Sequence, residues 1–249
     1  MIRVLLFILL ILPYENFAQD PNLLLREAQQ YESQMRENEA FQKYTECLRL
    51  QPNNLAAACK CSELCSRIGN RQIEKAKKID YFKAARTYAN AALRMNPSSS
   101  EANFVMAFAL GRMTLISSGK ERIGAVKEIQ YYAEASIRDD STNFKPYHVL
   151  GKWNYEVSDL SLTERSLAKW FYGGLPPASL DKAIENYEKC LSLSPNFLLN
   201  YLELAKAYYR NNERKRASQL LARMLILPNR MADDSRIKDE GRLLLRRWN

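Results

Sequence analysis

The chain has 249 residues, 47% of them apolar, and a formal net charge of +9. Its eight glycines and nine prolines stand mostly between apolar runs of helical spacing, which argues against both a disordered chain and a β-rich fold. The excess of lysine and arginine is compatible with three kinds of partner: an acidic protein, nucleic acid or a membrane surface.

Residues 1–18 differ in kind from the rest of the chain. Arg3 precedes an unbroken apolar run from Val4 to Leu12, and the small residue Ala18 ends the segment. This order predicts a secretory signal peptide, a mature chain that begins near Gln19, and a periplasmic or secreted location, which argues against nucleic acid. The apolar run is too short to span a bilayer as a helix, which disfavours a permanent anchor. An uncleaved N-terminal anchor is the alternative interpretation.

The first predicted helix hairpin shows a particular order of small and large side chains. Ala40, Tyr44, Cys47 and Pro52 stand at offsets of 0, 4, 7 and 12, which places the first three on one helical face. Small side chains let two helices approach each other, the aromatic ring fills the space toward the next helix, and proline ends the helix. The order therefore predicts helices that pack in pairs.

The same order recurs four more times, in copies that end at Pro97, Asp140, Pro195 and Pro228. Of these copies, the one that ends at Pro195 keeps the order most fully. Self-similarity of this kind resembles tetratricopeptide (TPR) repeats. The resemblance implies an all-α fold, in which antiparallel helix hairpins stack into a superhelical array and a C-terminal helix caps the last hairpin.

We expect one helical repeat domain over residues 19–249. The excess length of its second and third repeats is predicted to be lengthened helix, because few helix breakers occur there. The expected repeats are residues 21–54, 55–99, 100–142, 143–197 and 198–230, followed by a capping helix over residues 232–248.

The fourth repeat contains an insert between residues 157 and 180. Ser161 and Glu164 have the spacing of a capping box, which predicts a short helix over Leu162–Tyr172 that ends at Gly173. The insert is therefore a small element of its own, added to the repeat pattern.

The sequence around this insert resembles the regulator of microtubule dynamics family. The similar segments are LGKWNYEVSDLS (Leu150–Ser161), FYGGLPP (Phe171–Pro177) and AIENYEKCLSLSPNF (Ala183–Phe197). The resemblance extends over about residues 40–228 and implies a non-enzymatic helical scaffold, since members of the family are scaffolds and some are tied to microtubules or organelle contacts. The chain departs from the family at its start, where a cleavable leader stands in place of an organelle anchor.

No residue pattern typical of catalysis or of cofactor binding stands out. His148 is the only histidine, and the chain has neither a Gly-x-Ser-x-Gly motif nor a glycine-rich phosphate-binding loop. Cys59, Cys61 and Cys65 lack the second pair of ligands that a zinc site requires, and the repeat pattern predicts that they are buried thiols. We expect no enzymatic activity, no cofactor and no metal.

The TPR resemblance also implies a binding surface, because the first helix of each hairpin lines a concave groove in such arrays. Glu101 and Glu156 would be nearly the only acids of this groove, so the expected partner is an acidic protein or peptide that also bears apolar side chains. In the alternative arrangement, the aromatic residues pack under the insert and the basic residues are solvated. The predicted lining is Phe104, Phe108, Arg112, His148, Lys152, Tyr155, Lys206, Tyr209 and Arg210.

These patterns favour a secreted or periplasmic scaffold that binds a protein or peptide in a basic, aromatic groove. The first alternative is a membrane-surface adaptor, in which the leader is retained and the lysine-rich segment from Arg71 to Lys83 contacts anionic lipid. The second alternative is an enzyme. It requires a deep polar pocket in which a carboxylate lies within hydrogen-bond distance of His148.

Overall fold

The computed structural model describes residues 20–117 and 119–248, and the predicted leader lies outside them. The described residues form twelve α-helices and no strand, which confirms the predicted all-α class. The helices are α1 (Pro21–Ser33), α2 (Glu37–Leu50), α3 (Leu55–Arg71), α4 (Lys75–Met95), α5 (Ser100–Met113), α6 (Gly119–Asp139), α7 (Lys145–Ser158), α8 (Leu162–Tyr172), α9 (Leu180–Leu193), α10 (Leu198–Arg210), α11 (Arg214–Ile226) and α12 (Asp234–Trp248).

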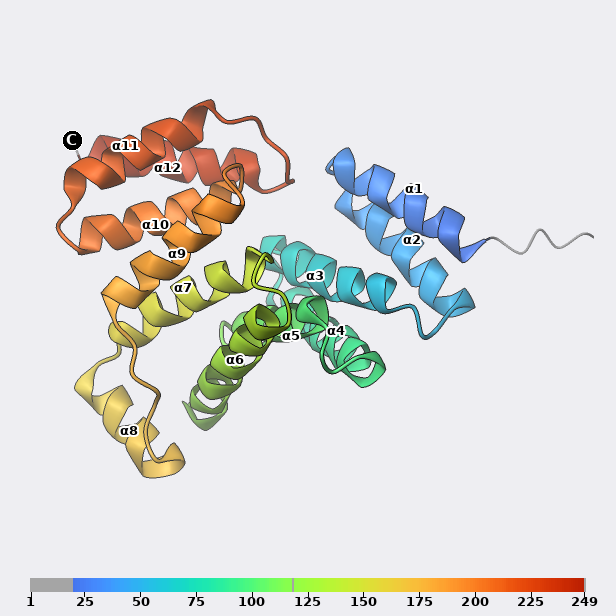
Figure 1. Ribbon diagram of the computed structural model, residues 1–249, viewed down its shortest axis with the longest axis horizontal. Helices are drawn as coiled ribbons and strands as arrows, with labels where there is room; N and C mark the ends of the chain where they lie inside the picture. The colour runs from blue at the N-terminus through green and yellow to red at the C-terminus, as the bar shows by residue number, and fades with distance from the viewer. Residues whose placement is uncertain (1–19, 118, 249) are drawn as a thin grey trace, which may run out of the picture.

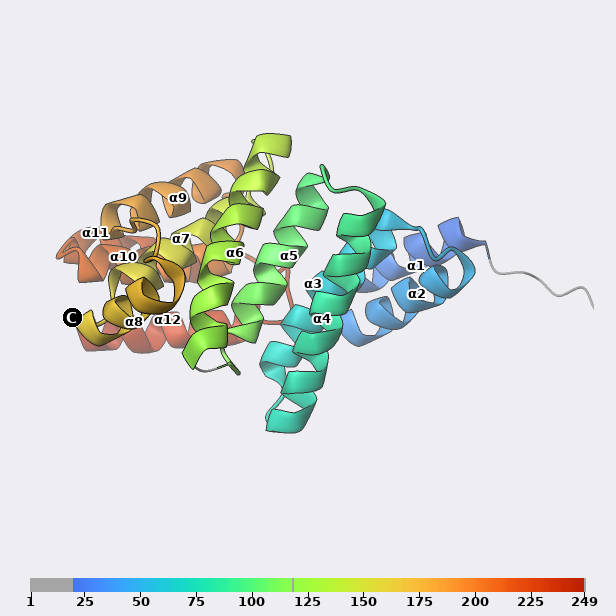
Figure 2. The ribbon, with the colours of Figure 1, turned by 90° about the horizontal axis from the view of Figure 1, so that it is seen from below.

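The helices stack as hairpins in one curved row, as predicted from the repeats (Figure 1). α1 packs on α2, α3 on α4, α5 on α6, α7 on α9 and α10 on α11, while α12 covers α10 and α11. Figure 2 shows α4, α5 and α6 side by side in the middle of the row. The first helices of successive hairpins, α3, α5, α7 and α10, contact one another in turn. We call the side that they form the concave face.

The recurring small and aromatic residues form the core where helices meet. Ala40, Tyr44 and Cys47 of α2 are buried, and Tyr187 of α9 is buried in the same manner. Tyr187 lies against Gly151 of α7, where an added Cβ would stand 2.5 Å from a carbon of the tyrosine ring. The glycine therefore allows α7 and α9 to approach closely, which is the packing that the sequence pattern predicts.

Polar residues that precede several helices fix where those helices begin. The side chains of Asn54, Ser99 and Ser179 each accept a hydrogen bond from a backbone N–H group three residues later, at 3.0 Å, 3.3 Å and 3.1 Å. Such caps satisfy N–H groups of the first turn, which have no partner within the helix.

The predicted helix of the insert is confirmed as α8. Ser161 and Glu164 form the capping box in both directions, and Gly173 ends the helix in the left-handed conformation with φ 69°. The helix packs against α6, and the side chain of Trp170 points away from the array with 85% of its surface exposed.

All five cysteines are buried free thiols, as the repeat pattern predicts. Cys59 and Cys65 belong to one core cluster, whereas Cys61 belongs to the neighbouring one. Burial raises the pKa of each of these three thiols to about 12. In the part of the chain that the structure describes, no helix combines the length and the apolarity that crossing a membrane requires.

Candidate functional site: the concave face

A cavity of about 670 Å³ opens on the concave face, and we call it the main cavity. Side chains of α5, α6, α7 and α10 form its walls, and the segment Asp233–Glu240 closes one side. Its floor includes Val126 of α6 and Trp153 of α7, whose indole N–H group donates a 2.7 Å hydrogen bond to the Val126 carbonyl oxygen. The cavity therefore combines a largely apolar floor with polar walls.

A row of aromatic rings on α5 leads into the main cavity. Phe104 and Phe108 are one helical turn apart and stack with their ring centroids 5.6 Å from each other. Lys145 Nζ lies 4.9 Å from the centroid of Phe104, and the Arg112 guanidinium carbon lies 4.8 Å from that of Phe108. Each end of the aromatic row thus carries a cation in contact with a ring face.

Two lysines of the predicted groove share one carboxylate. Glu203 of α10 lies 2.8 Å from Lys152 Nζ and 3.0 Å from Lys206 Nζ. Burial alone would raise the pKa of Glu203, but the two ammonium groups outweigh it and lower this pKa to about 2. Lys206 also contacts Glu240 of α12, at 2.8 Å. We call these four residues the Glu203 cluster.

The capping helix covers the end of the predicted groove. Tyr209 stacks on Trp248 of α12, with ring centroids 4.2 Å apart. Arg210 lies over the ring of Tyr155, donates a hydrogen bond to its carbonyl oxygen and pairs with Asp159 at 2.9 Å. These contacts hold the three side chains of the prediction against their own chain.

The structure therefore divides the nine predicted residues into two groups. The residues that line the main cavity are Phe108, Arg112, His148 and Lys152. The residues that lie beside it, in contacts with other parts of the chain, are Phe104, Tyr155, Lys206, Tyr209 and Arg210.

The expectation that the groove is almost free of acid is wrong. The charged residues that line the main cavity are four cations (Arg112, Arg122, Lys152 and Arg236) and six carboxylates (Glu156, Asp159, Glu164, Glu203, Asp233 and Glu240). Glu203 precedes Lys206 by three positions and shares its helical face, so its presence could have been inferred from spacing. Asp233 and Glu240 follow the last repeat, and repeat geometry alone does not place them.

His148 is held by an amide and by aromatic rings. Its Nδ1 lies 3.1 Å from Asn200 Oδ1, and Asn200 in turn donates a 2.8 Å hydrogen bond to the Tyr187 carbonyl oxygen. The ring packs against Phe197 and Tyr187, and burial lowers the pKa of His148 to about 4. The carboxylate that the enzyme interpretation places beside His148 is replaced here by the Asn200 amide.

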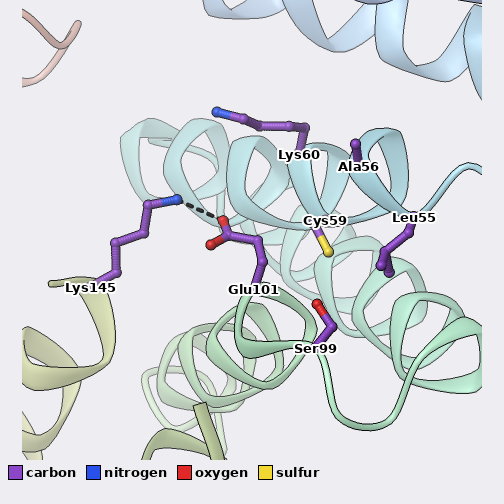
Figure 3. Close-up of a pocket in the computed structure, with 7 residues that line it drawn as sticks. All are labelled: Leu55, Ala56, Cys59, Lys60, Ser99, Glu101 and Lys145. Atoms are coloured by element: carbon purple, nitrogen blue, oxygen red, sulfur yellow. Dashed lines mark hydrogen bonds and ion pairs between the residues drawn. The ribbon is translucent and has the colours of Figure 1, made fainter. Parts of the chain in front are cut away.

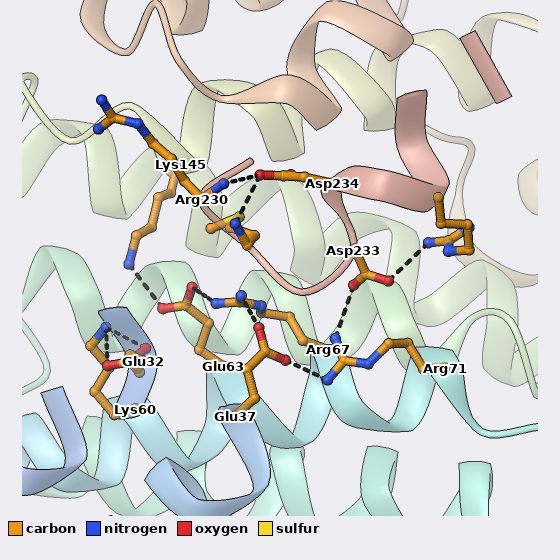
Figure 4. Close-up of polar contacts among 12 residues, drawn as sticks. Glu32, Glu37, Lys60, Glu63, Arg67, Arg71, Lys145, Arg230, Asp233 and Asp234 are labelled. Carbon is orange, nitrogen blue, oxygen red and sulfur yellow. Dashed lines mark hydrogen bonds and ion pairs between the residues drawn. The ribbon is translucent and has the colours of Figure 1, made fainter. Parts of the chain in front are cut away.

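A second set of ion pairs joins the N-terminal half of the array to the C-terminal segment (Figure 4). Glu37, at the start of α2, pairs with both Arg67 and Arg71 of α3. Arg71 also reaches Asp233, before α12, at 3.0 Å, although the two residues are 162 positions apart in the chain. Glu63 and Lys145 lie 2.9 Å apart beside these residues. We call all six residues the N-terminal network: Glu37, Glu63, Arg67, Arg71, Lys145 and Asp233.

A smaller hollow of about 450 Å³ lies between α3, α5 and the start of α7 (Figure 3). Its polar edge is the ion pair between Lys145 Nζ and Glu101 Oε1, at 2.6 Å. The thiol of Cys59 faces this hollow, but its raised pKa keeps it protonated and unreactive at neutral pH. The hollow therefore offers a packing surface rather than a nucleophile.

Solved structures with the same architecture include a TPR protein. A thermophilic TPR protein of Thermus thermophilus matches with a TM-score of 0.66 and 14% identity, over 90% of this chain and 100% of that protein. PilF of Pseudomonas aeruginosa matches with a TM-score of 0.54 and 14% identity, over 91% of this chain and 90% of that one. At this identity the matches show the fold alone.

Sequence comparison identifies a specific family, which the fold matches alone do not. The family model for regulator of microtubule dynamics proteins 1–3 matches residues 24–249. Regulator of microtubule dynamics protein 1 of Caenorhabditis elegans is 24% identical over 187 residues, which are 75% of this chain and 80% of the relative. The protein of the same description from Bos taurus is 27% identical over 174 residues, 70% of this chain and 55% of the relative.

The chain spans little more than half the length of the mammalian relatives that it matches. The family match nevertheless extends over the helical array from within α1 to the end of the capping helix α12. It also agrees with the resemblance that the segments around the insert show. The chain therefore belongs to the regulator of microtubule dynamics family.

Proposed function

We propose that this protein is a non-enzymatic scaffold that holds a protein partner on its concave face. The observation that carries the proposal is the main cavity, in which apolar side chains and charged groups from successive hairpins converge on one opening. Clefts in which polar groups converge beside apolar side chains are typical of recognition sites. Repeat arrays generally use such concave surfaces for binding, which supports the same conclusion.

The ion pairs of the concave face narrow the chemistry of the proposed partner. Lys152, Lys206 and Arg210 already contact carboxylates of their own chain. A strongly acidic segment would have to displace those carboxylates, and the displaced acids would repel it. We therefore propose a partner segment that is largely apolar and carries few negative charges.

Site-specific photo-crosslinking tests whether a partner occupies the concave face. A benzophenone amino acid in place of Leu199, which lines the main cavity, should yield an adduct with a defined protein in extracts of the native host. The same substitution at Tyr131, exposed on α6, is the matched control and should not. If both positions yield the same adducts, or neither yields one, the proposal is wrong.

A second candidate partner is an acidic surface that meets the start of α4. Lys75 and Lys77 are exposed there, beside the fully exposed side chain of Ile73. The names of the relatives make microtubules the first such surface to test. Co-sedimentation with polymerised tubulin should be lost in the double variant Lys75→Glu, Lys77→Glu and retained in the double variant Arg214→Glu, Lys215→Glu, an equal change of charge at exposed residues of α11. Equal sedimentation of the two variants would exclude this surface.

The location of the protein depends on the predicted leader. We propose export with cleavage near Gln19, which leaves the mature scaffold outside the cytoplasm. An exported protein would meet no tubulin, so this proposal and the microtubule surface exclude each other. The intact mass of the protein purified from its native host tests this proposal. A chain that retains Met1 would contradict it and would favour the membrane-surface adaptor, in which the same α4 lysines contact anionic lipid.

A further inference from the structure

Arg112 differs from the other cations of the concave face. Lys145 contacts Glu63 and Glu101, Lys152 contacts Glu203, and all three contacts are shorter than 3.0 Å. The guanidinium of Arg112 makes no ion pair with any carboxylate that the structure describes. A cation that is removed from water without a counter-charge is costly, because its hydration is lost and not replaced.

The surroundings of Arg112 leave part of its guanidinium group without a hydrogen bond. Arg112 Nη1 donates to Asn70 Oδ1 at 3.3 Å, and the ring of Phe108 covers one face of the group. The Nε atom is shielded from solvent and has no partner among the described residues. Burial lowers the pKa of Arg112 to about 10, and the attraction of the nearby carboxylates of Asp233 and Glu203 offsets this only in part. Arg112 nevertheless lines the main cavity, where a ligand can reach it.

The rest of the main cavity limits what that ligand can be. Six carboxylates against four cations disfavour a ligand with several negative charges, such as a phosphate ester. The apolar side chains Leu115, Val149 and Leu202 favour an apolar body beside the charge. Glu156 Oε1 and Asp159 Oδ1 pair with Lys152 and Arg210. A bare alkyl chain would remove their second oxygens from water without giving them a donor, whereas the N–H groups of a peptide backbone can supply one.

We propose that Arg112 binds the C-terminal carboxylate of a partner segment that ends in an apolar residue. This inference rests on the proposed scaffold function and names the chemical group of the partner that the main cavity takes. A guanidinium group presents parallel N–H donors to the two oxygens of a carboxylate, and such a bond is strongest where water is excluded. The apolar side chain of the last residue would then lie against the floor of the cavity.

The full-length protein with ¹⁵N-labelled arginine allows a direct test. N-acetyl-leucine, which carries one carboxylate and one apolar side chain, should shift the Nε–Hε resonance of Arg112 with a saturating, approximately millimolar dissociation constant, about the affinity expected for so small a ligand. N-acetyl-leucinamide has the same shape without the charge and should bind at least about tenfold more weakly. The resonance of Arg67, already paired with Glu37, is the internal control and should not move.

Two results of this titration would overturn the inference. One is an equal response to the acid and the amide, or a response of Arg67 that matches that of Arg112. The other is a shift that decanoate produces at a lower concentration than N-acetyl-leucine, since that order would identify a fatty acid site. The variant Arg112→Lys assigns the resonance, because it removes the Nε–Hε group and keeps the charge.

The crosslinking assay separates this inference from the proposed function. If Arg112→Lys lowers the yield of the adduct at position 199 by at least about tenfold while its melting temperature is unchanged, both hold. If the yield is unchanged, a partner binds the concave face without using Arg112, and only the inference fails. If the unaltered protein gives no adduct, the proposed function fails, and the response to N-acetyl-leucine decides the inference by itself.

Discussion

The concave face contains two groups of buried charges that are built in opposite ways. In the N-terminal network, two arginines converge on the carboxylate of Glu37, and each of them keeps a second acid, Glu63 or Asp233. In the Glu203 cluster, two lysines converge on a single buried carboxylate. In the first group the second acid of each arginine is also largely buried, whereas the other acids of the two lysines, Glu156 and Glu240, are half-exposed.

Both groups show that most charged residues of the concave face stabilise the repeat array. Both groups join helices of different hairpins, so their first role is to hold the curvature of the row. A pair that is already satisfied offers little to a ligand, since any new contact replaces an old one. The basic residues that make a groove attractive in the sequence are therefore mostly structural, and Arg112 is the exception on which the proposed recognition depends.

Removal of Glu203 should have the largest effect. Glu203→Gln leaves Lys152 and Lys206 with only the half-exposed carboxylates of Glu156 and Glu240, and it should lower the free energy of unfolding by about 3–5 kcal/mol. Urea unfolding followed by circular dichroism measures this loss. Glu240→Gln, which removes the more exposed carboxylate of the same cluster, is the control and should cost about 0–1 kcal/mol. Equal losses in the two variants would show that the lysines do not depend on Glu203.

Removal of Glu37 should have a smaller effect, although Glu37 is equally buried. After Glu37→Gln, Arg67 still contacts Glu63 and Arg71 still contacts Asp233. We expect a loss of about 2–3 kcal/mol in the free energy of unfolding, because each arginine retains a second acid that is itself largely buried. The same urea experiment checks it. A loss larger than that of Glu203→Gln would reverse the contrast between the two groups.

The two groups also mark what the sequence could and could not predict. The hairpins follow from local spacing, because Ala40, Tyr44 and Cys47 must meet a neighbouring helix wherever the array goes. The capping box of Ser161 and Glu164 is equally local and was predictable for the same reason. Local patterns thus determine the helices and the packing of each pair.

Contacts across the concave face are not local. Arg71 and Asp233 meet because each hairpin is rotated slightly relative to the one before it, and these rotations together curve the array. A short sequence pattern does not predict that overall curvature. The predicted lining contained the basic residues of the inner helices but not Glu203, which stands three residues before Lys206. It therefore found four side chains of the main cavity but misjudged the charge around them.

The pH dependence of stability should separate His148 from both carboxylate groups. The folded-state pKa of His148 is about 4, below the value of about 6.5 in an unfolded chain, so the unfolded state binds more protons between these values. Stability should therefore fall as the pH falls from 6.5 toward 4, by about 2 kcal/mol at pH 5.

His148 is the only histidine of the chain, which makes this pH window specific. Glu203 and Glu63, with pKa values of about 2, contribute stability above pH 4.5 that is lost only as the pH falls further toward 2. Urea unfolding at pH 7.0 and pH 5.0 measures the difference. His148→Gln should abolish it, and a difference that persists in this variant would contradict the assignment.

The contact between Arg71 and Asp233 should have the smallest effect on global stability. Both side chains are partly exposed, so Asp233→Asn should cost about 0–1 kcal/mol. Its effect should appear locally, because the contact ties the segment before α12 to α3. The backbone N–H groups of Arg230 and Met231, which donate to Asp234, should exchange with solvent up to about fivefold faster. Arg236→Ala removes a contact that Asp233 makes within its own segment and should leave this exchange unchanged. If both variants accelerate it equally, the segment is held by its own contacts, and the two halves of the concave face are joined only through the stacked hairpins.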